Sequence, residues 1–207
     1  MKLLHRLRSD EALMLAFQQG DSSAFESLYG RHKDRLLRFL LGLGGSPGGT
    51  RERAEELAQD SWASVIKNVE NYRVESKFST YLFTVARNRW IDETRKLKVR
   101  TDVDGTLPTP TPSGSLDEYD AEVADIAVEG KLDIAVDYQR MLQAVEQLPQ
   151  DQRVVFLLKE AGFSLKDISQ QLNLPSETVK SRLRYARNRL RERFIQPSKP
   201  WRAVYER

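Results

Sequence analysis

The chain has 207 residues, a formal net charge of +3 and no cysteine. The absence of cysteine excludes thiolate zinc sites and disulfides within the chain, and the two isolated histidines, His5 and His32, cannot form a metal site by themselves. No apolar stretch could span a membrane and the N-terminus is too charged for a signal sequence, so we expect a cytoplasmic protein without membrane insertion. No nucleophile–base constellation and no cofactor motif is recognisable, so the sequence does not indicate an enzyme.

The charge is distributed unevenly along the chain. Residues 101–130 hold eight Asp or Glu and no Lys or Arg, which leaves the remainder of the chain at +11. This asymmetry indicates nucleic acid as a partner, with an acidic tether between two binding parts. The first part of the tether contains three prolines and few apolar residues, and it should not fold by itself.

Capping residues and glycines define the first two predicted helices. Ser9 or Asp10 can cap a helix that Gly20 is well placed to end, and Asp21 caps the next. The second helix runs to a glycine-rich stretch at 42–49, which is typical of a flexible connector. A phosphate-binding loop fits less well, because no Gly-Lys-Ser/Thr follows and no strand precedes it.

The third predicted helix has an acidic face. Thr50 opens it, and its apolar residues recur at steps of three and four from Ala54 to Val69. Acidic side chains in the first turns favour the helix macrodipole, which explains some of them, but they could also meet a basic partner protein. The face consists of Glu55, Glu56, Gln59 and Asp60.

Aromatic and basic side chains are interleaved over a polar loop, residues 71–77, and a fourth helix of about 20 residues starting at Ser79. Aromatic rings offer stacking faces for unpaired bases, and cations follow phosphates. Half of the aromatic residues must belong to the core, and we expect Phe83 or Tyr81 among them. The candidate contacts with single-stranded DNA are Tyr72, Arg73, Lys77, Arg87, Asn88, Trp90, Asp92, Arg95 and Lys96.

Asn88 and Asp92 are four residues apart and therefore lie on one helix face, where they could bond the base edges that pairing normally hides. The alternative is that Trp90 packs on the core and that Asn88 is only a surface amide.

The apolar pattern resumes near residue 131 and predicts two helices, one ending near Pro149 and one at Gly162. Ser164 and Asp167 then have the spacing of a capping box, which begins a short amphipathic helix. Asn173-Leu174-Pro175 supplies the break before a last helix.

The last helix combines one apolar stripe with a cationic surface. The stripe is Val179, Leu183, Ala186, Leu190 and Phe194, and residues 176–207 hold ten Lys or Arg against three Asp or Glu. A recognition helix places its polar N-terminal turn in the major groove, whereas a basic surface helix of an ordinary bundle would lack the capped partner helix and the break. The candidate contacts with duplex DNA are Ser176, Glu177, Thr178, Lys180, Ser181, Arg184 and Arg187.

Four segments resemble, in order and spacing, bacterial RNA polymerase sigma factors of the extracytoplasmic-function (ECF) class. They are GDSSAFESLYGRH, AEELAQDSW, YRVESKFSTYLFTVARNRWIDETRK and LPQDQRVVFLLKEAGFSLKDISQQLNLPSETVKSRLRYARNRLRE. The glycine-rich stretch 42–49, which is longer than the family's usual turn, and the tail 197–207 depart from the family pattern without touching a motif.

The resemblance implies an all-α protein of two small helical domains, residues 1–98 and 131–207, joined by an acidic linker at 99–130. It implies that Ala54–Trp62 docks on a coiled coil of the largest subunit of core RNA polymerase and that Tyr72–Lys96 reads and opens the minus-ten element. The helix-turn-helix would read the minus-thirty-five element. An anti-sigma factor and a stress or envelope-response regulon are further expectations of this resemblance.

Two other classes of protein fit less well. A conventional helix-turn-helix regulator shares the C-terminal part but has no need for stacking platforms on residues 72–96. A DNA recombinase would need a nucleophilic Ser or Tyr in a mixed α/β domain, and the sequence contains no strand pattern.

Overall fold

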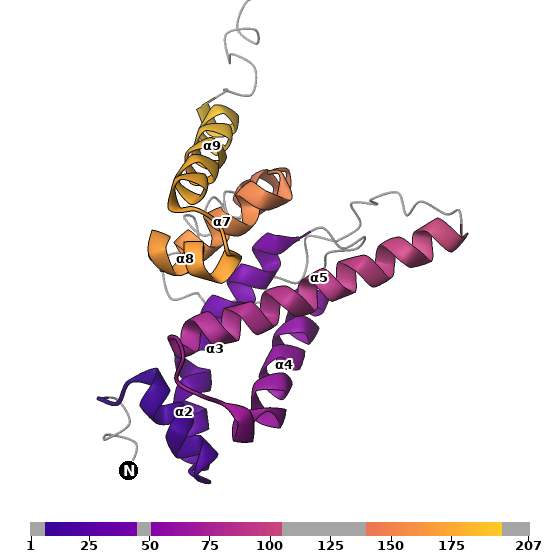
Figure 1. Ribbon diagram of the computed structural model, residues 1–207. Helices are drawn as coiled ribbons and strands as arrows, with labels where there is room; N and C mark the ends of the chain where they lie inside the picture. The colour runs from indigo at the N-terminus through magenta and orange to yellow at the C-terminus, as the bar shows by residue number, and fades with distance from the viewer. Residues whose placement is uncertain (1–6, 45–50, 105–139, 196–207) are drawn as a thin grey trace, which may run out of the picture. The chain divides into compact units, whose positions relative to one another are not determined.

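The computed structural model describes residues 7–44, 51–104 and 140–195, and within these ranges all regular structure is helical, as predicted (Figure 1). The chain divides into two compact units, residues 1–124 and 125–207. The glycine-rich stretch, most of the acidic linker and the C-terminal tail lie outside the described residues, so what the sequence predicts for them stays a prediction.

The N-terminal unit is a bundle in which α3 contacts α2, α4 and α5, while α4 and α5 pack along each other (Figure 1). Ser9 caps α2 by accepting from the amide of Ala12, and Gly20 follows that helix with a φ of 98°. Asp21 caps α3 by accepting from the next helical amides, as predicted. The elements are α2 (Asp10–Gln18), α3 (Ser22–Leu43), α4 (Arg51–Lys67), the 3-10 turn η1 (Val69–Asn71) and α5 (Phe78–Asp104).

All four helices of this unit, α2, α3, α4 and α5, contribute side chains to its core. Phe39 and Phe83 are buried there with ring centroids 5.1 Å apart, which confirms the core position expected for Phe83. The Arg35 guanidinium lies 5.0 Å from the centre of the Phe83 ring, and burial lowers the pKa of this arginine. Each large apolar side chain that is fully buried contributes about 1.5 to 3 kcal/mol, so this layer fixes the angle at which α5 crosses its neighbours.

Helix α5 is longer than predicted. It spans 27 residues instead of about 20, and it covers residues 99–104, which were predicted to belong to the linker. The reason is the lack of a stop signal, because neither Gly nor Pro occurs between Phe78 and Asp104 and the next residue is Gly105.

The C-terminal unit contains the predicted helix-turn-helix. Ser164 and Asp167 form a reciprocal capping box at the start of α8, and Asn173 ends that helix in the left-handed region with φ 51° and ψ 50°. Ile168 of α8 and Val179 of α9 are fully buried, which fixes the two helices against each other. Residues 140–146 are helical, and they precede α7 (Gln150–Glu160), α8 (Leu165–Leu172) and α9 (Ser176–Ile195).

Candidate DNA-binding and polymerase-binding surfaces

The buried stripe of α9 is confirmed for Val179, Leu183, Ala186 and Leu190, which are all at most 8% exposed. Because these residues face α7 and α8, the rest of the helix surface is available for contacts. Of the predicted DNA contacts, Ser176, Glu177, Lys180, Arg184 and Arg187 are exposed, and Thr178 and Ser181 are half-buried.

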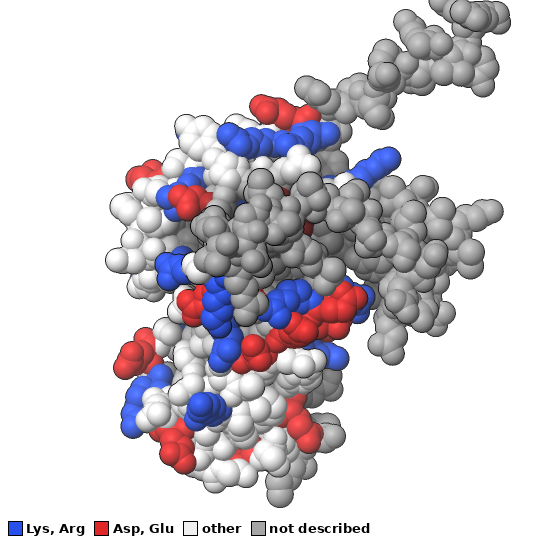
Figure 2. All heavy atoms as spheres, turned by 90° about the vertical axis from the view of Figure 1, so that its right-hand side faces the viewer, with Lys and Arg blue, Asp and Glu red and all other residues white. Residues whose placement is uncertain are grey.

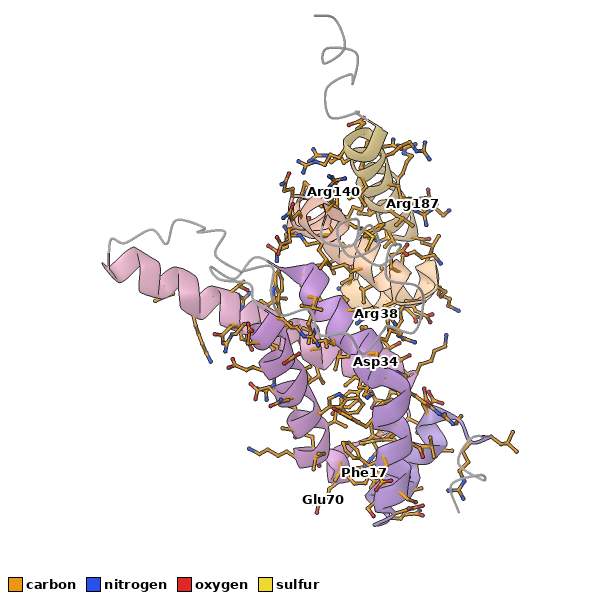
Figure 3. All side chains as sticks on the ribbon, turned by 180° about the vertical axis from the view of Figure 1, so that it is seen from behind. Phe17, Asp34, Arg38, Glu70, Arg140 and Arg187 are labelled. Atoms are coloured by element: carbon orange, nitrogen blue, oxygen red, sulfur yellow. The ribbon has the colours of Figure 1, made fainter. Side chains whose placement is uncertain are left out.

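On the face of α9 that is predicted to read duplex DNA, Lys180 forms an ion pair with Glu177 that is exposed to solvent. Lys180 Nζ lies 2.7 Å from Glu177 Oε1, and both side chains are more than half exposed. Such a pair contributes at most about 1 kcal/mol, so a phosphate can replace the carboxylate at little cost. Arg187 stands on the same helix (Figure 3).

Two further side chains on α9, which were not among the predicted DNA contacts, are also exposed. Tyr185 is 50% exposed, and the Arg184 guanidinium lies 5.3 Å from the centre of its ring. Asn188 is exposed and lies nearly opposite the buried stripe, since successive helix residues are about 100° apart. A helical projection of the stripe would have indicated both residues.

The orientation of α9 is supported from α7. Arg182 NH2 donates to Asp151 Oδ2 over 2.7 Å, and Asp151 lies in the first turn of α7. This ion pair and the buried stripe fix the N-terminal half of α9 against its neighbours.

On the loop and α5, most of the predicted single-strand contacts lie at the surface. The side chains of Asn88 and Asp92 make no hydrogen bond or ion pair with another described residue, and their spacing puts them on one face of α5. The side chains of Arg73, Lys77, Asn88, Asp92, Arg95 and Lys96 are exposed, and that of Arg87 is half-buried.

Trp90 does not offer a stacking face. Its side chain is 4% exposed, and its Nε1 donates to the carbonyl of Gly44 over 3.0 Å. The residue lies one turn after Ala86 and two turns after Leu82, so it continues the buried stripe of α5. The alternative reading, a core tryptophan, is therefore the correct one.

Tyr72 is also a core residue, with 5% of its surface exposed. Its ring centroid lies 5.5 Å from that of Tyr81 and 6.4 Å from that of Phe78. Burial, with the nearby Glu11 carboxylate, raises the pKa of Tyr72 to about 12, so the phenol stays neutral. The prediction that Tyr72 is a stacking platform for a base is therefore wrong, because the rings of Tyr81 and Phe78 pack against it.

The acidic face of α4 is largely paired with arginines. Glu55 accepts from Arg51 over 2.8 Å, and Glu56 accepts from Arg53. Asp60 Oδ2 lies 3.5 Å from NH1 of Arg89 in α5. Figure 2 shows acidic and basic side chains side by side on this face of the N-terminal unit. Gln59 is exposed between them.

The same arginines join α4 to α5. Arg53 bonds Glu93 of α5 as well as Glu56, and Arg89 donates to the Ser64 hydroxyl in addition to its pair with Asp60. The predicted polymerase-binding face and the predicted strand-binding helix therefore share a layer of ion pairs.

Within the part of the chain that the structure describes, no three His, Cys, Asp or Glu side chains are grouped so that they could hold a metal ion. Nor does any helix in this part of the chain have the length and hydropathy needed to cross a membrane.

The chain thus has two helical units, and the second contains a helix-turn-helix whose last helix has a cationic outer face. Residues 28–100 match the family Sigma-70 region 2, and residues 138–190 match Sigma-70, region 4.

Curated relatives cover most of this chain. SigM of Mycobacterium tuberculosis, an ECF RNA polymerase sigma factor, is 30% identical over 184 residues, which are 88% of this chain and 83% of SigM. SigW of Bacillus subtilis is 28% identical over 179 residues, covering 86% of this chain and 92% of SigW.

Solved structures have the same fold. The sigma factor RpoE of Bartonella quintana, in complex with the anti-sigma factor NepR, is 25% identical with a TM-score of 0.65, covering 84% of this chain and 98% of RpoE. CnrH, in complex with the cytosolic domain of CnrY, is 18% identical with a TM-score of 0.64, covering 92% of this chain and all of CnrH.

The chain belongs to the ECF RNA polymerase sigma factors, as its sequence motifs indicated. It is not an enzyme: it binds core RNA polymerase and directs promoter-specific transcription initiation.

Proposed function

We propose that three surfaces of this sigma factor each have a separate binding role in transcription initiation. The acidic face of α4 docks on core RNA polymerase. The loop at 72–77 and the exposed face of α5 capture an unstacked base of the minus-ten element, and α9 reads the minus-thirty-five duplex. The observation that carries this proposal is the pair Asn88 and Asp92, exposed on one face of α5 without partners among the described residues.

The energetics of strand capture depend on these polar groups. Extruding a base costs a few kcal/mol. Since Tyr72 and Trp90 are buried, the offset comes from hydrogen bonds of Asn88 and Asp92 to the base edge and from nearby cations. A hydrogen bond that involves a charged group contributes about 1.5 to 3 kcal/mol. The Arg73 guanidinium is exposed, and NH1 holds it against the carbonyls of Glu70 and Tyr72, so it adds a planar cation on which a base can stack.

The docking surface on α4 works by exchange of ion pairs. The bonds of Glu55, Glu56 and Asp60 to arginines are solvent-exposed, so each contributes about 1 kcal/mol or less and can be exchanged for cations of the polymerase.

The proposal extends to partners and compartment. RpoE and CnrH each have a partner protein in their complexes, and RpoE's is named as an anti-sigma factor. An anti-sigma factor would hold this chain inactive until a stress or envelope signal releases it, and the chain would act in the cytoplasm on the polymerase found there.

The test compares duplex and pre-melted promoters. Asn88→Ala is assembled with core polymerase and assayed on a duplex template and on one with a mismatched bubble at the minus-ten element. We expect transcription from the duplex to fall about tenfold, and from the bubble to stay near the parental level. Gln143→Ala removes an exposed amide from the C-terminal unit and serves as the matched control. Parental activity of Asn88→Ala on both templates would refute strand capture by this residue.

A further inference from the structure

The side chain of Gln18, the last residue of α2, bonds three backbone carbonyls of the segment that leads into the loop. Its Nε2 lies 2.8 Å from the carbonyl oxygen of Val69, 3.0 Å from that of Glu70 and 3.3 Å from that of Tyr72. The Val69 carbonyl also accepts from the backbone amide of Tyr72 within the turn, and the carbonyls of Glu70 and Tyr72 also accept from NH1 of Arg73. The Gln18 amide is therefore a second donor to these carbonyls, and it ties the end of η1 to α2 at the point where the loop begins.

Glu11, on the same helix, holds the other end of the loop. Its Oε1 accepts from the backbone amide of Phe78 over 2.9 Å, and Phe78 is the first residue of α5. The first amides of a helix lack intrahelical acceptors, and the preceding Lys77 has no side-chain oxygen to cap them. A carboxylate at this position also favours the helix macrodipole.

Glu11 and Gln18, which we term the α2 clamp, are seven residues apart, so they lie on one face of α2 about two turns from each other. Figure 3 labels Phe17 and Glu70 at the place where α2 meets η1. Between the two fixed points, residues 73–77 are all exposed, and Val74 is 52% exposed. The loop has little packing of its own, so its conformation is set by the clamp, by the buried Tyr72 and by the bonds from Arg73 NH1 to the carbonyls of Glu70 and Tyr72.

We propose that α2 is part of the promoter-opening device, with Gln18 and Glu11 as positioning residues that preset the loop for the unstacked base. This inference rests on the proposed role of the loop in strand capture. A loop that must be ordered on binding costs conformational entropy at every residue, and a preset loop avoids that cost. Helix α2 precedes residue 28, where the match to Sigma-70 region 2 begins.

The variants are chosen to alter the clamp without changing the size of the side chain. Gln18→Met removes the donor, and Gln18→Glu places a carboxylate against three carbonyl oxygens. Gln19→Glu makes the same charge change on the next residue, whose side chain is exposed, and is the matched control.

The first measurement is trypsin cleavage of the free, full-length protein after Arg73 and Lys77, which are both exposed. We expect cleavage at these two sites to rise about tenfold in Gln18→Glu, less in Gln18→Met, and not in Gln19→Glu. Unchanged cleavage in both Gln18 variants would overturn the clamp.

The second measurement is open-complex formation by the holoenzyme on duplex and bubble templates, with affinity for core polymerase determined in parallel. We expect Gln18→Glu to open the duplex about tenfold more slowly, to use the bubble almost like the parent, and to bind core normally. Equal loss on both templates would mean that Gln18 has only a structural role, and would overturn the proposal.

The two proposals can fail separately. If the Gln18 variants loosen the loop but open the duplex at the parental rate while Asn88→Ala is defective, strand capture stands and positioning by α2 is overturned. If Asn88→Ala also opens the duplex normally, the proposed function of this surface is itself wrong.

Discussion

Asp10 Oδ2 lies 2.7 Å from Nε2 of His32, a side chain that is almost fully buried in α3. A carboxylate can only accept, so Nε2 is the protonated nitrogen of this pair. Arg31 donates to the other carboxylate oxygen over 2.7 Å. The hydrogen bond from His32, with help from Arg31 and against the effect of burial, lowers the pKa of Asp10 to about 2 from its usual 3.8. The first turn of α2 is thereby fixed to α3.

We predict that Asp10→Asn lowers the free energy of unfolding by about 2 kcal/mol at neutral pH. The folded state prefers the ionised carboxylate, so this contribution is fully present above the unfolded pKa of 3.8 and disappears as the pH falls toward about 2. Unfolding of the full chain followed by tryptophan fluorescence at several pH values measures it. Asp34→Asn, on the exposed face of α3, is the control, and a difference from the parent that stays constant down to pH 3 would contradict the assignment.

The burial of Trp90 gives a second prediction. Trp90→Ala should destabilise the N-terminal unit by about 3 to 5 kcal/mol, because it leaves a cavity and removes the donor to Gly44. Asn88→Ala, two residues earlier and exposed, should change stability by less than about 0.5 kcal/mol. Thermal unfolding followed by circular dichroism compares the melting temperatures of the two variants. Similar melting temperatures would contradict the core position of Trp90.

For α9, we predict that Lys180→Ala and Arg184→Ala each weaken promoter recognition by about 1 to 3 kcal/mol without unfolding the domain. Arg189→Ala removes the same charge from the opposite flank of the helix and should have a smaller effect. Val179→Asp, at a fully buried position, should instead unfold the C-terminal unit, which circular dichroism would detect. If both alanine variants transcribe like the parent at moderate salt, the DNA-reading face has been placed on the wrong side of α9.

On α4, charge reversal should weaken holoenzyme formation. We expect Glu56→Lys and Asp60→Lys to lose affinity for core polymerase, since each replaces a contact to a basic partner by repulsion and also meets Arg53 or Arg89 within the chain. Asp34→Lys makes the same change on an exposed part of α3. Parental affinity of the α4 variants in a titration would leave their acidic side chains as solvated residues of a helix start.

The sequence predicted local features well because they depend on neighbouring residues. The caps at Ser9, Asp21 and Ser164 and the buried stripe of α9 follow from spacing along a single helix. Tyr72 was misassigned because a loop has no periodicity from which burial can be read, and its packing partners, Phe78 and Tyr81, come from the next helix.

Contacts between distant segments were not predictable from spacing. Gln18 and the carbonyl of Glu70 are 52 residues apart in sequence, and Glu11 and the amide of Phe78 are 67 apart. From the sequence alone, Gln18 and Glu11 look like ordinary surface residues of a helix. Their role becomes visible only when the fold brings the partner backbone next to them. Trp90 differs, because its step of four from Ala86 already indicated the core.

The most direct test of the division between strand capture and duplex reading is site-specific photocrosslinking in the open complex. A photoreactive residue replaces Val74 on the loop in one variant and Tyr185 on α9 in another, both at positions that are at least half exposed. We predict that position 74 crosslinks to the exposed strand of the minus-ten element only when core polymerase is present, and that position 185 crosslinks to the minus-thirty-five duplex. Two results would contradict this account: crosslinking of position 74 to duplex DNA in the absence of core polymerase, or crosslinking of position 185 to the minus-ten strand.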